Sequence, residues 1–313
     1  MKHLFILNPI AGGGRRTGEV RAEILCVMEA QDDPWELYET TGVADATRKV
    51  REAAEAHEHL RVYACGGDGT LNECVNGAVG QAHVAVTHFP AGTGNDFIKT
   101  FAVGKAHFFD LERLLDAEEM ALDVIDVDGR YGINICSVGL DARIGADVHQ
   151  YSGLPFVRGK GAYVVSLLAN VVKGITQTLE VQAGEETIRQ KFTLICACNG
   201  RSYGGTFTPV PDAMPDDGQL DILLVDRVSR LGVAQLVGKY AKGRFREVPH
   251  KIRHIRGKSL TIRADRMFVV NVDGEILRRQ EVTFTLLPAA VKFFAPRGAS
   301  FKASKSNNFL EAY

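Results

Sequence analysis

The sequence of 313 residues has no apolar run long enough to cross a bilayer, and it carries little net charge. The longest apolar stretch, Ala162–Val172, is well short of the roughly 18–20 residues that a spanning helix needs. The opening run MKHLFILNP ends in Asn-Pro and lacks the length of a signal-peptide core, so we expect neither a leader nor a span. A net charge of −1 gives no global field, so any attraction to nucleic acid or membrane must come from local patches.

Cysteine is scarce, and no two cysteines form a CxxC pair. Most of the six lie inside apolar runs, which predicts reduced, buried thiols in a cytosolic protein. They are Cys26, Cys65, Cys74, Cys136, Cys196 and Cys198. No ligand spacing typical of zinc is present, so a zinc site is not expected.

The common nucleotide-binding fingerprints are also missing. Gly13–Gly18 has the glycine spacing of a P-loop, but Glu19 stands where that motif requires lysine. Gly92-Thr93-Gly94 begins like GxGxxG but continues with Asn95. A P-loop enzyme and a dehydrogenase are therefore disfavoured.

The length suits two domains, and the pattern of the chain changes near Asp123. Before it, strand-like and helix-like segments alternate, which predicts a doubly wound parallel sheet that binds ligands beyond the carboxyl ends of its strands. The expected strands are His3–Leu7, Trp35–Glu39, Leu60–Cys65 and Val84–Phe89, and the expected helices are Arg16–Ala30, Ala44–Ala56 and Thr70–Val79.

After Asp123, strand-like runs dominate and predict a β-sandwich-like second domain. The runs are Asp123–Val127, Tyr131–Val138, Thr178–Gln182, Phe192–Cys198, Gln219–Val225, Leu260–Ala264, Met267–Val272 and Glu281–Leu286. Helical stretches are expected near Ala162–Val172 and Val233–Lys242. We place an α/β domain at residues 1–122 and a β-rich domain at 123–290, with 291–313 returning to the first.

Three glycine-rich loops follow strands of the first domain. They are Asn8–Gly14, Gly66–Thr70 and Ala91–Asp96. Glycine lets backbone N–H groups approach a phosphate, and a helix N-terminus adds partial positive charge. Each loop alone is equally well read as a tight turn, but three at one sheet edge could wrap a triphosphate. Two of them also carry an aspartate, which suits a Mg²⁺-phosphate site.

Taken in order, these loops resemble the diacylglycerol kinase catalytic-domain family, and the soluble bacterial lipid kinases within it. The resemblance rests on Asn8-Pro9-x-Ala11-Gly12, Gly66-Gly67-Asp68-Gly69-Thr70 and Gly92-Thr93-Gly94-Asn95-Asp96. It continues through Asp123, Ser137–Asp141, Gly204-Gly205, Pro211–Ala213, Asp216–Gly218 and Asp273-Gly274-Glu275. GGDGT alone also occurs in NAD kinases and phosphofructokinases, whereas its combination with GTGND is typical of lipid kinases.

The resemblance implies ATP and Mg²⁺ as cofactors. The implied ATP contacts are Asn8, Pro9, Ile10, Ala11, Gly12, Thr40, Gly66, Gly67, Asp68, Gly69, Thr70, Leu71, Asn72 and Thr93. The implied catalytic residues are Asp68, Asp96 and Glu275, and either Asp68 or Glu275 could take the proton of the acceptor hydroxyl.

Each of these assignments has a structural alternative. Thr40 could cap the following helix, and Asp68 could cap the helix that begins near Thr70. Asp273-Gly274 could be no more than a hairpin turn.

A structural Mg²⁺ loop is implied at Met214–Gln219. Its ligands would be the Asp217 carboxylate and the carbonyls of Met214 and Gln219, with Asp123 linked through water. Pro215 departs from the family pattern between two of these ligands.

A kinase of this kind must collect a lipid at a membrane surface. One basic stretch, in which Glu247 is the single acidic residue, could dock on anionic lipid. It comprises Lys239, Lys242, Arg244, Arg246, Lys251, Arg253, Arg256 and Lys258, with Tyr240 and Phe245 interleaved. Arg15, Arg16, Arg158 and Lys160 could assist. The alternative is a solvated face or internal salt bridges, and no nucleic-acid motif accompanies the stretch. The segment from Leu154-Pro155-Phe156 to Val172 could line an acyl groove or form a core helix.

The sequence therefore predicts a cytoplasmic, membrane-peripheral, ATP-dependent lipid kinase of phospholipid metabolism, with diacylglycerol as the first candidate acceptor. A sphingoid base, ceramide or another lipid alcohol is an alternative, as is a regulatory protein that binds nucleotide without catalysis. A homodimer is the assembly we consider, and the sequence leaves the oligomeric state open.

Overall fold

The structure, a computed structural model, describes residues 1–152 and 174–301. The expected helix at Ala162–Val172, the preceding Leu154-Pro155-Phe156, and both Arg158 and Lys160 lie outside the described residues. Within those residues, no helix is both long and apolar enough to cross a membrane.

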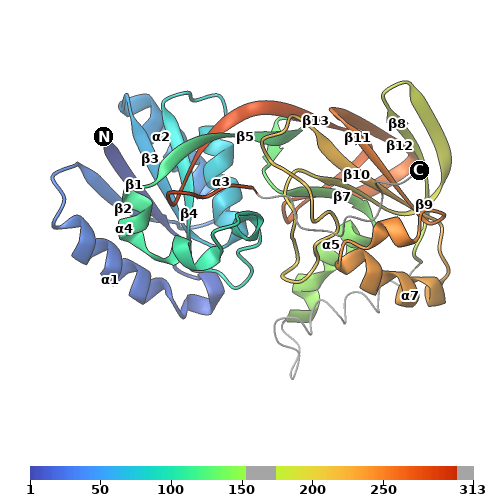
Figure 1. Ribbon diagram of the computed structural model, residues 1–313, viewed down its shortest axis with the longest axis horizontal. Coiled ribbons are helices and arrows are strands. Elements are labelled where there is room, and N and C mark those ends of the chain that lie inside the picture. Colours follow the sequence, from blue (N-terminus) through green and yellow to red (C-terminus); the bar gives the residue numbers. More distant parts are fainter. Residues whose placement is uncertain (153–173, 302–313) are drawn as a thin grey trace, which may run out of the picture.

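The N-terminal half is a parallel sheet with helices on both faces (Figure 1). Its strands pair in the order β2-β1-β3-β4, and each is short and mostly apolar. The strands are β1 (Lys2–Leu7), β2 (Trp35–Glu39), β3 (Leu60–Gly66) and β4 (Val84–Pro90). The helices are α1 (Thr17–Met28), α2 (Asp45–Ala56), α3 (Asp68–Ala78) and the short α4 (Leu111–Leu115). α1 buries Val20, Ile24 and Met28, which recur every four residues on one helix face.

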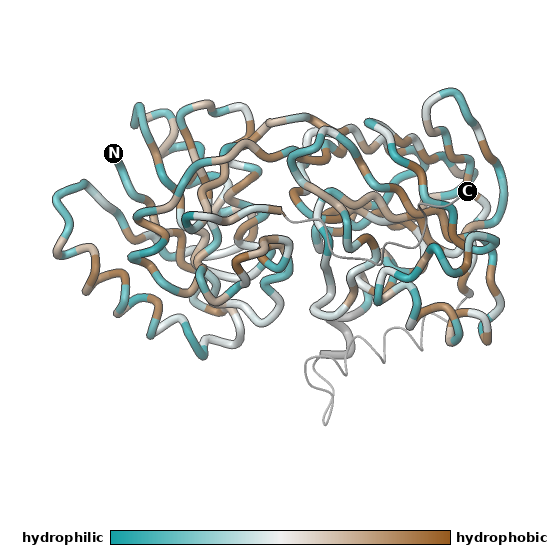
Figure 2. Tube along the Cα trace, viewed as in Figure 1, coloured by the Kyte–Doolittle hydropathy of each residue, from teal (hydrophilic) through white to brown (hydrophobic). Residues whose placement is uncertain are grey.

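The C-terminal half is built from antiparallel strands. They are β6 (Arg130–Gly132), β7 (Ile135–Gly139), β8 (Gln177–Ala183), β9 (Glu186–Cys198), β10 (Leu220–Asp226), β11 (Ile252–Gly257) and β12 (Ser259–Val272). Two helices, α5 (Leu140–Ser152) and α7 (Arg230–Ala241), lie beside them. Hydrophobic residues follow the strands of both halves, whereas hydrophilic residues gather at the loops (Figure 2).

Two strands, β5 (Glu118–Val127) and β13 (Glu275–Ala295), run between the halves (Figure 1). β13 starts antiparallel to β12, and its end pairs parallel to β4 through Lys292 and Phe293. The register of β13 against β5 shifts between Leu287 and Val291, so one strand serves both cores. This arrangement confirms the predicted class, a doubly wound α/β domain followed by a β-rich domain.

Some local predictions were wrong in detail. The predicted strand Tyr131–Val138 is broken at Ile133 and Asn134, because their N–H groups bond to the Asp273 carboxylate rather than to a strand. Leu260–Ala264 and Met267–Val272 form one strand, β12, with an irregularity in its pairing. Five cysteines are buried as predicted, but Cys26 is exposed on the outer side of α1.

Candidate active site

The three glycine-rich loops meet at the carboxyl edge of the parallel sheet. Asn8, after β1, donates its side-chain amide to Thr70 Oγ1 at 3.2 Å. The N–H groups of Ala91 and Gly92, after β4, both donate to the Gly66 carbonyl at the end of β3. The structure thus gathers Asn8–Gly12, Gly66–Asn72 and the loop that carries Thr93 into one region, as the spacing of the strands predicts.

Glycine is required where these loops touch. A Cβ atom on Gly92 would lie 2.5 Å from the Cα atom of Gly67, and one on Gly12 would lie 2.7 Å from the Ala91 carbonyl oxygen. Gly12 also has a φ of +59°, in the region that favours glycine. The loops are therefore more than three separate turns, since their backbones are in contact.

Asp68 ties the second loop to the third. Its Oδ1 accepts the N–H groups of Asp96 at 2.5 Å and Phe97 at 3.2 Å. The capping alternative for Asp68 was wrong: α3 begins at Asp68 itself, and Gly67 is the residue before its first turn. Burial raises the pKa of Asp68, and the neighbouring Asp96 carboxylate raises it further, although His88 and the two N–H donors act the other way.

Asp96 joins the third loop to the C-terminal half. It pairs with Lys99, and its Oδ2 accepts the Gly205 N–H at 2.8 Å. Lys99 Nζ also reaches the Gly205 carbonyl at 3.3 Å. The turn that contains Gly204-Gly205 therefore forms one wall of the region.

Thr40 and Thr93 lie less close to the point where the three loops meet. Thr40 follows β2, and its N–H donates to the Leu7 carbonyl, so it lies one strand away from the first loop. It does not cap α2, because Ala44 precedes that helix and the Asp45 carboxylate accepts the N–H of Thr41. Thr93 is exposed at the tip of its loop.

Glu275 is the first residue of β13, after a turn at Asp273 and Gly274. Its side chain is 36% exposed and forms an ion pair with Arg130. Asp273 is more than a turn residue, because its carboxylate accepts the N–H groups of Ile133, Asn134 and Ile135 and the amide of Asn72.

Sequence reasoning assigned Asn72 to ATP and missed Asn76, and both residues join the two halves. Asn76 on α3 donates to the Tyr131 carbonyl and accepts the Tyr131 N–H, and Asn72 donates to the same carbonyl. The signal was present, because two asparagines four residues apart share one helix face and such polar residues need partners when buried. Arg130 and Lys99 gave no comparable signal, whereas Gly205 belongs to the Gly204-Gly205 pair already noted in the family resemblance.

The implied metal ligands lie in the turn before β10. Asp217 Oδ1 accepts the Gln219 N–H at 3.0 Å, and the Met214 carbonyl accepts the Asp217 N–H at 3.4 Å. Among residues 1–152 and 174–301, no three His, Cys, Asp or Glu side chains gather as a metal centre.

The oxygen donors of this turn nevertheless suit a hard cation. Burial raises the pKa of Asp216, and the neighbouring carboxylates of Asp123 and Asp217 raise it further. Negative charge is therefore concentrated in this turn, as a divalent cation would require. Asp217 already pairs with Arg256, so a cation would have to compete with that arginine. Asp123 accepts the N–H groups of Gly218 and Ala289 and so ties this turn to β13.

Most of the basic stretch is paired inside the protein. Five of its eight cations form ion pairs with acidic side chains, namely Lys239, Arg244, Arg246, Arg253 and Arg256. One of the acids, Glu247, belongs to the stretch, and the other four acids lie outside it. Lys242, Lys251 and Lys258 form no ion pair among the described residues. Tyr240 and Phe245 are buried, so neither offers its ring to a membrane.

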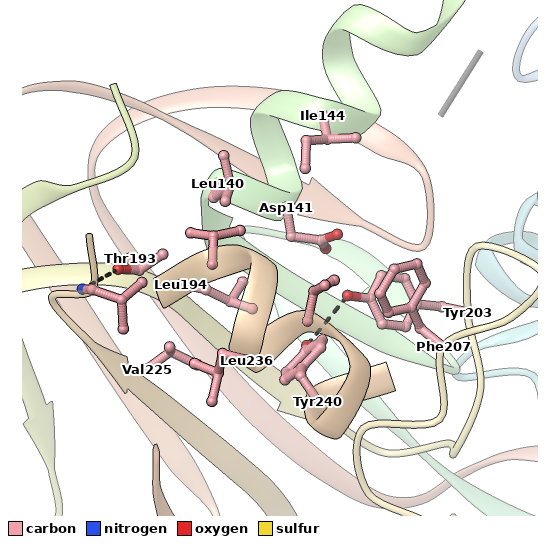
Figure 3. A pocket seen from close by; sticks show the side chains of 13 residues that line it. Leu140, Asp141, Ile144, Thr193, Leu194, Tyr203, Phe207, Val225, Leu236 and Tyr240 are labelled. Atoms are coloured by element: carbon pink, nitrogen blue, oxygen red, sulfur yellow. Dashed lines mark hydrogen bonds between the residues drawn. The ribbon is translucent and has the colours of Figure 1, made fainter. Parts of the chain in front are cut away.

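An apolar pocket lies in the C-terminal half, between α5, α7 and the sheet (Figure 3). It holds about 540 Å³ of empty space, part of it open to solvent. Tyr203 and Phe207, which flank Gly205, form one side of it, and Tyr240 contacts Tyr203 through their hydroxyl groups at 3.2 Å. Asp141 is the charged residue of the lining and accepts the Ser137 hydroxyl.

Fold and site together define a class: a two-domain protein in which glycine-rich loops at a parallel-sheet edge face a β-rich domain. Residues 2–127 match the model of the diacylglycerol kinase catalytic domain, and residues 134–295 match that of the YegS C-terminal NAD kinase beta sandwich-like domain. The chain belongs to this diacylglycerol kinase-like family, as its motifs predict.

Similar proteins carry related names. Proteins of Staphylococcus aureus strains JH9 and N315, both named "Putative lipid kinase", are 27% identical over 232 residues, which is 74% of this chain and 75% of theirs. Two structures from Bacillus anthracis str. Sterne, each titled as a "putative diacylglycerol kinase", share the fold. One has a TM-score of 0.74 at 24% identity and covers 93% of this chain and 94% of its own. The other has a TM-score of 0.72 at 23% identity and covers 93% and 96%.

Proposed function

We propose that this protein transfers the γ-phosphate of ATP to the hydroxyl group of a lipid, with diacylglycerol as the first candidate acceptor. The observation that carries the proposal is the contact among the three glycine-rich loops, which Asp68 holds together through the N–H groups of Asp96 and Phe97. Backbone N–H groups and a helix N-terminus at one sheet edge suit a polyphosphate. The family to which the chain belongs supports the same chemistry.

Of the two carboxylates that could take the hydroxyl proton, Glu275 is the better placed. Asp68 Oδ1 is committed to two backbone N–H groups, so that side chain holds the second and third loops together. Glu275 is partly exposed, and among the described residues its ion-pair partner is the exposed Arg130. An incoming phosphate would draw Arg130 away and leave Glu275 free to accept the proton.

The apolar pocket supports a lipid acceptor. Its lining is almost wholly apolar, which suits the chains of a lipid. The turn at Tyr203–Phe207 links it to Asp96 through Gly205, so a chain bound there would end near the phosphate region.

One observation favours a second acceptor, a long-chain amino alcohol. Asp141 places a carboxylate among the apolar residues of the pocket, where an ammonium or hydroxyl group could donate to it. Diacylglycerol has no ammonium group, so the two acceptors differ in what they offer to Asp141.

Mg²⁺ is the metal we propose, both with ATP beside Asp68 and Asp96 and in the turn of Met214, Asp217 and Gln219. Bound there, it would supply positive charge to the phosphates or to the crowded carboxylates. Addition of MgCl₂ without nucleotide should raise the melting temperature of the wild type, and Asp217→Ala should remove that rise. An equal rise in both proteins would argue against the second site.

A transfer assay with labelled ATP and a panel of lipid alcohols in micelles tests the proposal. We expect lipid-dependent turnover in the wild type and a loss of at least about a hundredfold in Asp68→Ala and in Glu275→Ala, because each removes a charged group from the reaction. Circular dichroism and melting curves check that both variants fold. ATP binding without turnover on any lipid would instead indicate a regulatory nucleotide-binding protein.

A further inference from the structure

The turn that carries Glu275 is fixed by a carboxylate two residues earlier. Asp273 Oδ1 accepts the Ile135 N–H at 2.6 Å. Its Oδ2 accepts the N–H groups of Ile133 at 2.6 Å and Asn134 at 3.0 Å. Three consecutive N–H groups, two between β6 and β7 and one at the first residue of β7, thus close around one side chain, and this accounts for the break between those strands.

The same oxygen reaches the other half of the protein. Asp273 Oδ2 also accepts the side-chain amide of Asn72 at 3.2 Å. Asn72 lies one helical turn after Asp68, on the helix that the second glycine-rich loop opens. A short path of contacts therefore runs from the candidate phosphate loop to the turn before Glu275.

Gly132, at the end of β6, lies beside this carboxylate. A Cβ atom there would lie 2.9 Å from Cys136 Sγ but in ordinary contact, 3.5 Å, with Asp273 Oδ2, so the glycine makes room for Cys136. Asp273 has a φ of +49° and Gly274 a φ of +100°, as a two-residue hairpin turn between Val272 and Glu275 requires. The backbone of the turn is therefore ordinary, and the hydrogen bonds of the Asp273 carboxylate are what distinguish it.

We propose that Asp273 is a positioning residue, which holds Glu275 at a fixed place relative to the phosphate-binding loop by bonding the N–H groups of residues 133–135 and the amide of Asn72. This inference rests on the proposed function, because the position of Glu275 matters for transfer only if Glu275 acts on the acceptor hydroxyl. The interaction acts through Glu275, and Asp273 does not touch the reacting atoms.

Asp273→Asn is the sharpest test. An amide keeps one acceptor oxygen but presents an NH₂ group on its other side, so it cannot accept from both directions. We expect kcat to fall at least tenfold while KM for ATP and for lipid stays within about twofold, because binding groups remain and only the alignment is lost. Amide hydrogen exchange at Ile133, Asn134 and Ile135 should become faster.

Two control variants separate positioning from general loss of stability. Asp126→Asn alters another turn aspartate, which among the described residues accepts the Gly129 N–H at 2.8 Å in its own hairpin. Val127→Ala removes methyl groups from a fully buried side chain and destabilises the same region without touching Asp273. Both should retain kcat within about twofold. Glu275→Gln should lose turnover but keep the slow exchange at residues 133–135.

The outcomes are distinguishable. Equal kcat in wild type and Asp273→Asn would overturn this inference alone, and so would a kcat loss in Val127→Ala as large as that in Asp273→Asn. Absence of lipid-dependent turnover in the wild type would overturn the proposed function, and the inference with it.

Discussion

Asp273 shows how one buried carboxylate can be charged at some cost. Burial raises its pKa to about 6, and this effect outweighs the four N–H donors that favour its ionised form. In return, the ionised carboxylate accepts hydrogen bonds from several donors of both halves at once. A neutral side chain of similar size has fewer acceptor positions.

This raised pKa predicts a pH dependence of stability. The pKa of about 6 in the folded protein lies above the value of 3.8 expected for the unfolded chain, so folding favours the protonated form. The contribution to the free energy of unfolding is full below pH 4 and is lost as the pH rises to 6, by at most about 3 kcal/mol. Asp273→Asn lacks this titration.

Urea unfolding of both proteins between pH 4 and pH 7 measures the effect. The difference in unfolding free energy, wild type minus Asp273→Asn, should increase as the pH falls from 6 to 4. A difference independent of pH would show that Asp273 keeps an ordinary pKa in the folded protein.

At the scale of elements, the glycine-rich loops work as a packed group. Each follows a parallel strand, and neighbouring parallel strands end at the same edge, so the loops are placed side by side. The close approach of Gly67 and Gly92 then decides how near they come. This contact belongs to no single loop and is made only when the sheet has formed.

Gly92→Ala should separate the second and third loops, because its Cβ atom would lie 2.5 Å from the Cα atom of Gly67. We expect a loss of stability of about 1–3 kcal/mol, as for other overpacked sites, and weaker ATP binding. Gly18→Ala is the matched control, since a Cβ atom there meets nothing within 4 Å on the helix α1. That substitution should leave ATP binding unchanged and increase stability by up to about 1 kcal/mol. Denaturation and nucleotide titration distinguish the two, and equal behaviour of both variants would contradict the packing argument.

At the scale of the molecule, the two halves are joined by strands and by side chains. β5 and β13 run between them, Asn72 and Asn76 connect α3 to Tyr131, and Gly205 contacts Asp96. The apolar pocket that we propose for the acceptor lies in one half, and the glycine-rich loops that we propose for ATP lie in the other. In the proposed reaction, these contacts would set the distance between acceptor and nucleotide.

Membrane docking is a property of the whole surface, and we propose to test it first at Lys242, Lys251 and Lys258, which form no ion pair among the described residues. We expect the wild type to sediment with anionic vesicles at low salt and to be released at high salt, because each cation contributes about 1 kcal/mol. Reversal of all three lysines to glutamate should reduce binding more than tenfold. Lys105→Glu, an exposed site in the N-terminal half, is the control. Equal binding to neutral vesicles would contradict this electrostatic account.

Much of the fold could be predicted because it follows from short-range patterns in the sequence. An alternation of apolar strands and helices predicts a parallel sheet, as in Leu60–Gly66 followed by Asp68–Ala78. Glycine-rich turns after those strands indicate the edge at which a ligand would bind. The motif residues Asn8, Gly67 and Asp96 could be found in the same way. Boundaries were less certain, because the break at Ile133 and Asn134 depends on Asp273, which is distant in the sequence.

The sequence by itself determined the family, the strands and three main helices of the first half and the residue types at the glycine-rich edge, since these follow from short-range pattern and composition. It gave no sign of helix α5 or strand β11. Only the tertiary structure decided which charges are already paired, as in Arg256 with Asp217 and Arg130 with Glu275. It also decided that Asp273 bonds to Asn72 across the two halves. The physical reason is that a charged or polar side chain acts through its nearest partners, and those partners are brought close by folding rather than by spacing along the chain.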